Sequence, residues 1–306
     1  MRDILTHELG YSSNMIKKLK FSEGGILVNG HFVTVRHQLS EGETLSLAVE
    51  DTKADVSPYT VPVDLPLPVI FEDASVTAVN KPPAMPAHPS LGHKLDTVSN
   101  ALAYRYRDKN YVFRPVNRLD RDTSGCMLTA NTKAASYKMY LAMTGGQIKK
   151  QYIAVTDGVP QGMTSCGVLH SYMRRKDGSI VEREETNADD PEGREAITEY
   201  EVLLASDSHA VMLLSPITGR THQIRVQLAS AGCPVTGDSM YGSPSALIGR
   251  QALHSWRCAF PHPMSGERIT VTAPLYEDMT RLISALFPGE AERLFETLSE
   301  NGGTNG

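Results

Sequence analysis

The chain has 306 residues, 41% of them hydrophobic and 21% charged, which suggests about two soluble domains with a sizeable core. The net charge of −5 gives no sign of a nucleic-acid partner by itself. No run approaches the roughly 18 uncharged apolar residues of a membrane helix, the N-terminus has no apolar signal core, and the four cysteines form no CxxC pair. We therefore expect a cytoplasmic protein with free thiols and no membrane anchor.

Residues 1–55 predict a compact N-terminal module. A helix is expected over 12–25, where Ser12 or Ser13 can cap an apolar stripe that ends at a glycine pair. Two short strands around an Asn-Gly turn follow within 26–35, and a further turn and strand within 39–49. Three lysines project near the end of the helix, namely Lys17, Lys18 and Lys20.

A proline-rich stretch over 56–67 predicts a linker, because proline biases the residue before it towards extended geometry. Residues 68–300 then alternate strands with helices, which favours an α+β sheet domain over a doubly wound one. Strands are expected within 69–82, 126–131, 151–159, 196–206 and 209–217, and helices within 97–107, 133–147, 220–232 (amphipathic) and 277–300 (an acidic surface helix). Residues 301–306 are expected to form a flexible tail.

The modest net charge conceals a charge separation. Residues 101–153 contain ten Lys or Arg against three Asp, whereas residues 182–201 contain nine Asp or Glu against two Arg. The acidic stretch EREETNADDPEGRE is interpreted as a solvated loop. A local positive surface matters more to a polyanion than the total charge does, so the basic segment is compatible with RNA.

Five ordered motifs carry a family resemblance. They are VNKPPAMPAHPS (79–90), RPVNRLDRDTSG (114–125), KKQYIAV (149–155), SPITGRTHQIRVQLASAGCPVTGDSMYG (215–242) and ALHSWRCAFPHP (252–263). In combination, over about residues 68–275, they resemble the RluA-type pseudouridine synthases, which implies a mixed, largely antiparallel sheet with flanking helices. The N-terminal module resembles the alpha-L type RNA-binding module, although no full strand precedes its first helix.

The resemblance implies an isomerisation. A uridine within RNA is detached at nitrogen one, rotated and rejoined through carbon five, with nothing added or lost and no metal or redox cofactor. Two histidines, His88 and His93, have no third ligand nearby in the sequence, so we expect no metal site.

The resemblance also implies roles for individual residues. Asp120 matches the family's catalytic aspartate and Arg220 the arginine that pairs with it. Tyr152 matches the tyrosine that lies against the target base and is a candidate to take the proton from carbon five. We expect these three residues to be catalytic. A carboxylate can attack a sugar carbon or assist proton removal, and both roles need its ionised form, which an arginine favours. The residues expected to contact RNA or the flipped base are Arg118, Arg121, Asn80, Lys81, His88, Ile224, Lys17, Lys18 and Lys20. For Ile224, an ordinary core position is an equal alternative.

Two other functions compete with this one. A non-catalytic RNA-binding or assembly factor would need neither Asp120 nor Tyr152. A hydrolase that releases uracil normally needs a second carboxylate, for which Asp122 and Asp238 are the available residues. The favoured substrate is ribosomal RNA, with transfer RNA as an alternative, and a monomer is expected. Whether Asp120 attacks ribose, attacks the base or assists proton removal is left open.

Overall fold

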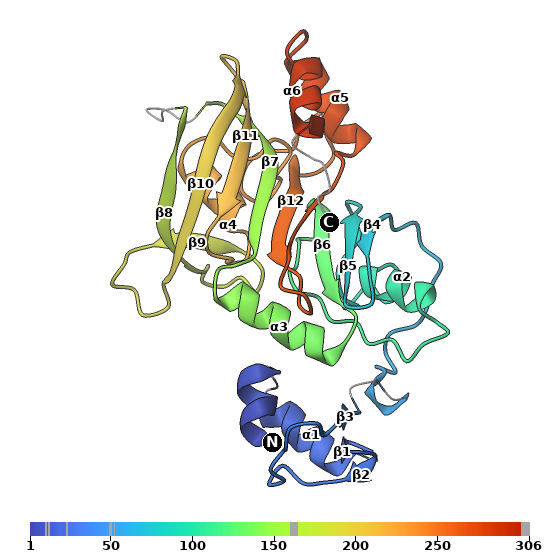
Figure 1. Ribbon diagram of the computed structural model, residues 1–306. Coiled ribbons are helices and arrows are strands. Elements are labelled where there is room, and N and C mark those ends of the chain that lie inside the picture. Colours follow the sequence, from blue (N-terminus) through green and yellow to red (C-terminus); the bar gives the residue numbers. More distant parts are fainter. Residues whose placement is uncertain are drawn as a thin grey trace.

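The computed structural model describes residues 1–9, 11, 13–22, 24–48, 51, 53–159 and 165–300. Within these residues the chain forms a small three-stranded sheet near the N-terminus and a ten-stranded sheet that takes up most of the molecule (Figure 1). The expected flexible tail and the capping role of Ser12 fall outside the described residues. In the part of the chain described, no helix is both long and apolar enough to cross a membrane.

The N-terminal part consists of helical elements and short strands. They are η1 (Ile4–Glu8), α1 (Ser13–Phe21), β1 (Ile26–Val28), β2 (His31–Phe32) and β3 (Leu45–Leu47), followed by η2 (Lys53–Asp55). The strands pair in the order β2-β1-β3, all antiparallel. Asn29 and Gly30 have φ angles of 51° and 80°, the left-handed values that a two-residue hairpin turn of type I′ requires. The predicted hairpin and the strand after it are confirmed.

The large sheet is mixed and almost wholly antiparallel. Its strands are β4 (Val69–Glu72), β5 (Val76–Lys81), β6 (Ser124–Ala130), β7 (Lys149–Asp157), β8 (Cys166–Arg175), β9 (Arg183–Thr186), β10 (Arg194–Ala205), β11 (His209–Pro216), β12 (Leu253–Pro261) and β13 (Arg268–Thr272). The order is β4-β5-β6-β12-β7-β11-β10-β8-β9, with β13 paired to β12. Only β6 and β12 pair in parallel within the described strands. The expected α+β class is confirmed.

Helices cover both the sheet and its ends. They are α2 (Val98–Arg105), α3 (Lys133–Thr144), α4 (Gln223–Ser230), α5 (Glu277–Leu286) and α6 (Ala291–Glu300). Thr97 and Thr132 cap α2 and α3 by accepting backbone N–H groups. The helix predicted within 220–232 starts only at Gln223 and is buried along most of its length, so the expected amphipathic pattern is wrong. A helix enclosed on nearly all sides needs no solvent face.

Two further expectations are corrected. The single acidic surface helix expected over 277–300 is two helices, because Pro288 and Gly289, with φ at 104°, interrupt it. The apolar faces of both helices join the main core through residues such as Leu282 and Leu298. The acidic segment expected to be a loop contains β9, since backbone pairing with β8 does not depend on side-chain polarity and charges are common on edge strands.

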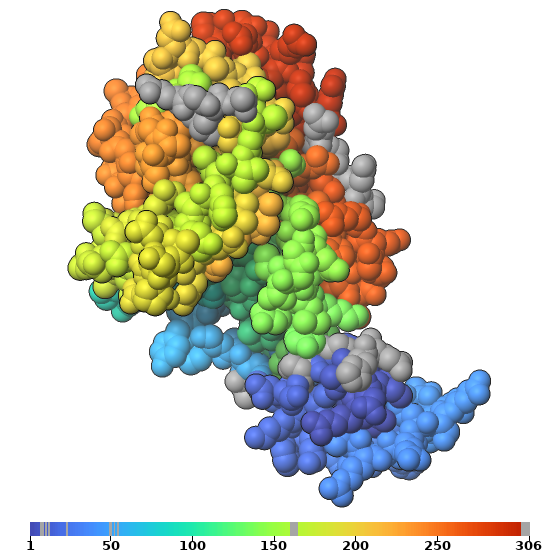
Figure 2. Space-filling view, turned by 90° about the vertical axis from the view of Figure 1, so that its left-hand side faces the viewer, coloured from blue at the N-terminus to red at the C-terminus, as the bar shows by residue number. Residues whose placement is uncertain are grey.

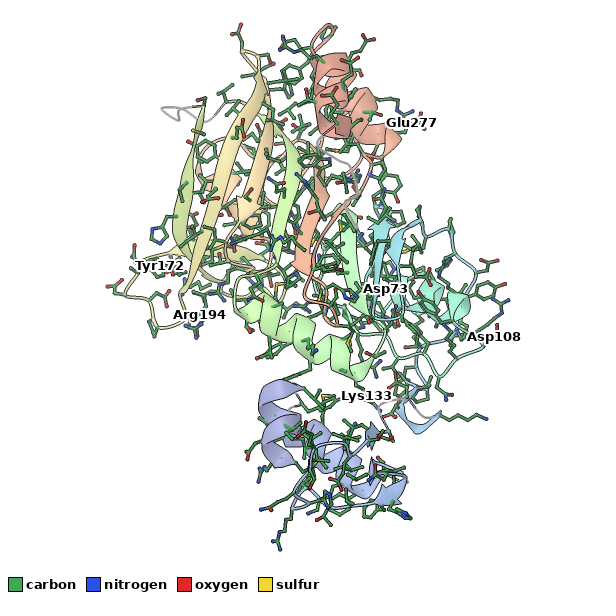
Figure 3. All side chains as sticks on the ribbon, in the orientation of Figure 1. Asp73, Asp108, Lys133, Tyr172, Arg194 and Glu277 are labelled. Carbon is green, nitrogen blue, oxygen red and sulfur yellow. The ribbon has the colours of Figure 1, made fainter. Side chains whose placement is uncertain are left out.

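An ion-pair cluster, which we call the Asp51 cluster, joins the N-terminal part to the large sheet. Asp51 accepts hydrogen bonds of 2.9 and 2.6 Å from Arg114, and Lys133 lies 3.3 Å from it. Lys133 also contacts Asp55, which pairs with Lys18 at 3.8 Å. Lys133 stands where α3 faces the N-terminal part (Figure 3), and the space-filling view shows the two parts meeting there (Figure 2). Two cations of the basic segment are therefore already neutralised.

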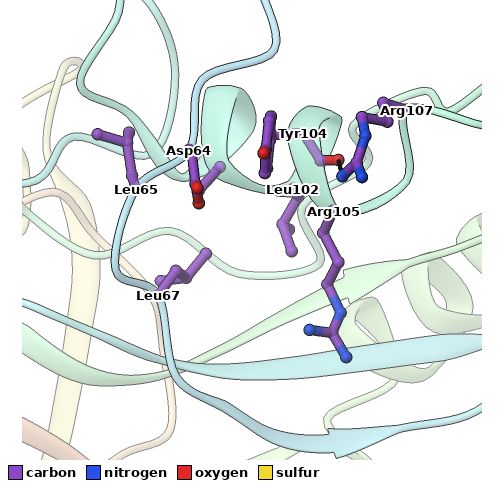
Figure 4. A pocket seen from close by; sticks show the side chains of 8 residues that line it. Asp64, Leu65, Leu67, Leu102, Tyr104, Arg105 and Arg107 are labelled. Carbon is purple, nitrogen blue, oxygen red and sulfur yellow. Dashed lines mark hydrogen bonds between the residues drawn. The ribbon is translucent and has the colours of Figure 1, made fainter.

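The predicted linker is tied to α2. Val63 donates its backbone N–H to the carbonyl of Asn100, and the Asn100 side chain donates to the carbonyl of Val61. Linker and helix flank a hollow of about 330 Å³ (Figure 4). The hollow is lined by Asp64, Leu65, Leu67, Ala101, Leu102, Tyr104, Arg105 and Arg107. None of these residues belongs to the five motifs.

Candidate active site

Asp120 lies in the loop that leads into β6. Asn117 holds this loop to the strand, because its side-chain oxygen accepts the N–H of Leu128 at 2.7 Å and its amide donates to Cys126. Leu119 is buried in the main core. The turn closes where Thr123 donates its N–H to the carbonyl of Asp120 at 3.2 Å. The motif therefore fixes the backbone on both sides of Asp120 while 26% of its side chain stays exposed.

The glycine after this turn is required by close approach. Gly125 has φ at 109°, and a Cβ added to it would lie 2.2 Å from the carbonyl oxygen of Ser255. No other residue fits without moving β12 away from β6. The Thr-Ser-Gly sequence thus brings the turn over residues 120–123, which we call the Asp120 turn, against the one parallel strand pair of the described sheet.

Arg225 is the cation that binds Asp120. Its Nη1 donates to Asp120 Oδ2 at 2.9 Å, while its Nε and Nη2 donate to the two oxygens of Asp238 at 2.6 and 2.8 Å. Its side chain is only 7% exposed. Burial alone would lower the pKa of this guanidinium, but the hydrogen bonds and charges of Asp238 and Asp120 outweigh it and raise the pKa. Arg225 is therefore a fixed positive charge beside the carboxylate.

The expected pairing of Arg220 with Asp120 is wrong. Arg220 precedes α4, and its Nε donates to the carbonyl of Glu195 in β10 at 2.9 Å. It is exposed, whereas Arg225 lies within the helix and points inward. The sequence held a signal for this, because an arginine between the apolar residues Ile224 and Val226 in a buried helix must have a carboxylate partner.

Asp238 serves as the anchor of that arginine. Its carboxylate is 1% exposed and also accepts the backbone N–H groups of Met240 and Tyr241 at 3.0 and 3.2 Å. Burial raises the pKa of Asp238, but the hydrogen bonds and charge of Arg225 lower it below its usual value. With both oxygens held, Asp238 is not placed to act as the second carboxylate of a hydrolase.

Tyr152 forms an apolar wall of the site from β7. It is 8% exposed, it lies opposite Ser255 in β12, and it belongs to the same core cluster as Ile224. Burial raises the pKa of Tyr152, a hydrogen bond with Ser255 lowers it, and the charge of Asp120 is among those that raise it further. The net shift is upward, so the phenol is neutral. Ile224 is a core residue that sits beside the site.

Asn80 and Lys81 are buried, so the expectation that they contact RNA is wrong. Lys81 is 0% exposed and donates to the carbonyls of Pro82, Met85 and Arg121 at 2.8, 2.9 and 2.8 Å. Three carbonyl acceptors match the three N–H donors of an ammonium group. Burial and the charge of Arg250 lower the pKa of Lys81 to about 7.

Two buried cationic side chains donate hydrogen bonds to the backbone carbonyls of the Asp120 turn. Lys81 binds the carbonyl of Arg121, and Arg250 donates to the carbonyl of Asp122 at 3.1 Å while pairing bidentately with Asp278. Asn80 donates to the carbonyl of Pro274. Sequence reasoning missed Arg250, for which the only signal is its place two residues before the ALHSWR motif.

The remaining predicted residues lie on the surface. Arg118 and His88 are both exposed. One side of the His88 ring packs against Phe113, and this partial burial, together with the charge of Arg118, lowers the pKa of His88. Arg121 pairs with Asp122 at 2.8 Å. The three lysines of α1, namely Lys17, Lys18 and Lys20, are exposed but belong to the N-terminal part beyond α3 (Figure 1). The structure does not bring these lysines to the Asp120 turn.

Comparisons with known proteins identify the family of this chain. Residues 75–230 match the family model described as RNA pseudouridylate synthase. An RNA pseudouridine synthase of Bacillus subtilis, YjbO, is 36% identical over 90% of this chain and 95% of its own. Ribosomal large subunit pseudouridine synthase D of Xanthomonas campestris is 34% identical over 86% of this chain and 81% of its own. The solved structure of human RNA Pseudouridylate Synthase Domain Containing 1 covers 69% of this chain and 84% of its own, with 26% identity and a TM-score of 0.56.

The family match and these relatives define the chain as an RNA-modifying isomerase, and its mixed sheet has the fold of the human structure. The chain belongs to the RluA-type family of RNA pseudouridine synthases.

Proposed function

We propose that this protein converts specific uridines of ribosomal RNA into pseudouridine, with Asp120 as its catalytic carboxylate. The observation that carries the proposal is the ion pair between Asp120 and Arg225, which is locked from behind by Asp238. Relatives named for the large ribosomal subunit support ribosomal RNA as the substrate class. Such a substrate would place the protein in the cytoplasm.

The chemistry requires a negative charge at a defined point. The bond between N1 and C1′ breaks, the uracil turns, a bond between C5 and C1′ forms, and the hydrogen of C5 leaves while N1 gains one. Arg225 holds Oδ2 of Asp120, which leaves Oδ1 for the reaction. The side chain is 26% exposed, so a nucleotide taken out of its stack can reach it. Attack on ribose, attack on the base and assistance with proton removal would each use this oxygen.

Tyr152 is proposed to pack against the target base. Stacking of a base on an aromatic ring is worth about 1–3 kcal/mol by alanine substitution. Because its pKa is raised by burial, the phenol is a poor proton acceptor, and we therefore do not assign it the removal of the C5 proton. Ile224 belongs to the same core cluster as this tyrosine.

Surface cations are proposed to hold the RNA around the flipped nucleotide. Arg118 is exposed two residues before Asp120, beside His88, and has no acidic partner within the described residues. Extruding a base costs a few kcal/mol, which a side chain that fills the vacated space offsets. The lysines of α1 (Lys17, Lys18 and Lys20) are proposed to bind phosphates further along the RNA.

The test uses RNA from a strain that lacks this protein. That RNA is incubated with the wild-type protein or with Asp120→Asn, and pseudouridine is mapped by chemical labelling and sequencing. New sites in ribosomal RNA with the wild type alone support the proposal. Sites in transfer RNA alone overturn the substrate class, and RNA binding without any new site supports the assembly factor instead.

A further inference from the structure

His222 has a backbone conformation that is uncommon for its residue type. Its φ and ψ are 58° and 17°, in the left-handed region, directly before the start of α4. Outside glycine, few residues adopt this conformation, and histidine is among those that tolerate it best. The side chain is directed inward and is 9% exposed. The fold therefore brings an imidazole into the site where the helix begins.

The imidazole bridges Tyr241 and the catalytic carboxylate. Its Nδ1 lies 2.8 Å from the hydroxyl of Tyr241, and its Nε2 lies 3.8 Å from Oδ1 of Asp120. Oδ1 is the oxygen that Arg225 does not hold, since Arg225 binds Oδ2. The two basic side chains thus approach the two oxygens of one carboxylate from different directions.

The hydrogen bonds of Tyr241 determine which nitrogen of His222 carries the proton. The Tyr241 oxygen already accepts the backbone N–H of Arg183 at 2.8 Å. Within the described part of the chain, the only acceptor in reach of its own O–H is Nδ1 of His222. Donation of this O–H to Nδ1 leaves the hydrogen of a neutral imidazole on Nε2, which faces Asp120.

The surroundings keep this imidazole neutral. Burial lowers the pKa of His222, and the charges of Arg225 and Arg183 lower it further, against the opposing charges of Asp120 and Asp238. A neutral donor leaves the charge of the nearby carboxylate in place. A cation there would compete with Arg225.

We propose that His222 is a positioning residue, whose Nε2–H donates a hydrogen bond to Oδ1 of Asp120 when RNA is bound and so fixes the rotation of the carboxylate. The distance of 3.8 Å is too long for that bond in the RNA-free protein. Hydrogen bonds of this kind often tighten only when substrate is present. The inference rests on the proposed function of Asp120.

The test compares two amides of different reach. Asn tolerates the left-handed backbone and places its amide near the Nδ1 position, whereas the amide of Gln reaches the position of Nε2. The single-turnover rate of pseudouridine formation and the Kd for the RNA are measured for wild type, His222→Asn, His222→Gln and Tyr241→Phe. The RNA is the ribosomal segment mapped with the wild type.

His222→Asn is expected to slow the single-turnover step by about 10- to 100-fold with an unchanged Kd, as misplacement of a catalytic group does. His222→Gln is expected to retain most of the wild-type rate. Tyr241→Phe is expected to lose part of the rate, because without the hydroxyl no hydrogen bond fixes which nitrogen of His222 carries the hydrogen. A wild-type rate in His222→Asn, or equal losses of rate in the Asn and Gln variants, overturns this inference but leaves the proposed function standing. Absence of product with the wild type overturns the proposed function and the inference with it.

Discussion

Replacing Arg225 and Arg220 in turn tests the arrangement of charge around Asp120. Arg225 binds two carboxylates with its side chain, and Asp238 is 1% exposed. Removing one partner of a buried ion pair costs about 3–5 kcal/mol, because the other charge is left uncompensated. Arg225→Ala is therefore expected to lower the free energy of unfolding by about that amount and to abolish pseudouridine formation.

Arg220→Ala is the matched control. The side chain is exposed and makes one hydrogen bond, to the carbonyl of Glu195, so its loss is expected to cost about 0.5–1.5 kcal/mol at most. The free energy of unfolding is measured by urea denaturation, and activity by conversion of uridine in ribosomal RNA. Any remaining loss of activity in Arg220→Ala is expected in RNA binding and not in the single-turnover rate.

A double replacement separates stability from chemistry. In Arg225→Ala combined with Asp238→Ala the uncompensated buried charge is gone, so part of the lost stability is expected to return. Activity is not expected to return, because Asp120 still lacks its partner. The reasoning is refuted if Arg220→Ala impairs the single-turnover rate more than Arg225→Ala, or if the double variant regains activity.

Three further predictions concern the scaffold. Burial lowers the pKa of His254 from 6.5 to about 4, so the stability that its neutral form provides is complete above pH 6.5 and lost as the pH falls towards 4. The loss amounts to about 3 kcal/mol. When the free energy of unfolding is measured by urea denaturation from pH 4 to 7, it should depend less steeply on pH in His254→Gln than in wild type. Parallel plots of this free energy against pH for the two proteins would refute the prediction. Gly125→Ala is expected to destabilise the sheet by several kcal/mol, since the new Cβ meets Ser255 at 2.2 Å; a wild-type melting temperature would contradict that close approach. Asp51→Asn leaves Arg114 and Lys133 without the anion that they share. Limited proteolysis should therefore cleave the chain ahead of β4 faster than in wild type. An unchanged cleavage rate would show that these ion pairs do not hold the N-terminal part against the rest of the chain.

Local signals predicted local structure well. Asn29 and Gly30 specify a hairpin because the turn itself demands left-handed backbone. Pairings between distant segments are different, since the parallel contact of β6 with β12 joins residues about 130 positions apart. No turn chemistry announces such a pairing.

The site was predicted as a set of motifs but not as a set of contacts. The resemblance implied that an arginine pairs with Asp120, but the partner is Arg225 and not Arg220, because only Arg225 lies within the buried helix. The resemblance implied that Lys81 contacts RNA, yet the buried ammonium group donates to three carbonyls of the chain. The charge of a side chain does not show whether it contacts RNA or donates hydrogen bonds inside the protein. Its burial distinguishes the two cases.

The most direct measurement follows the hydrogen that the reaction must remove. Ribosomal RNA carrying tritium at carbon five of uridine is incubated with purified wild-type protein and with Asp120→Asn, and the tritium that appears in water is counted. Release with the wild type, none above background with Asp120→Asn and no free uracil is the predicted result. Equal release from both proteins, or uracil set free by the wild type, would contradict the role assigned to the carboxylate that Arg225 holds.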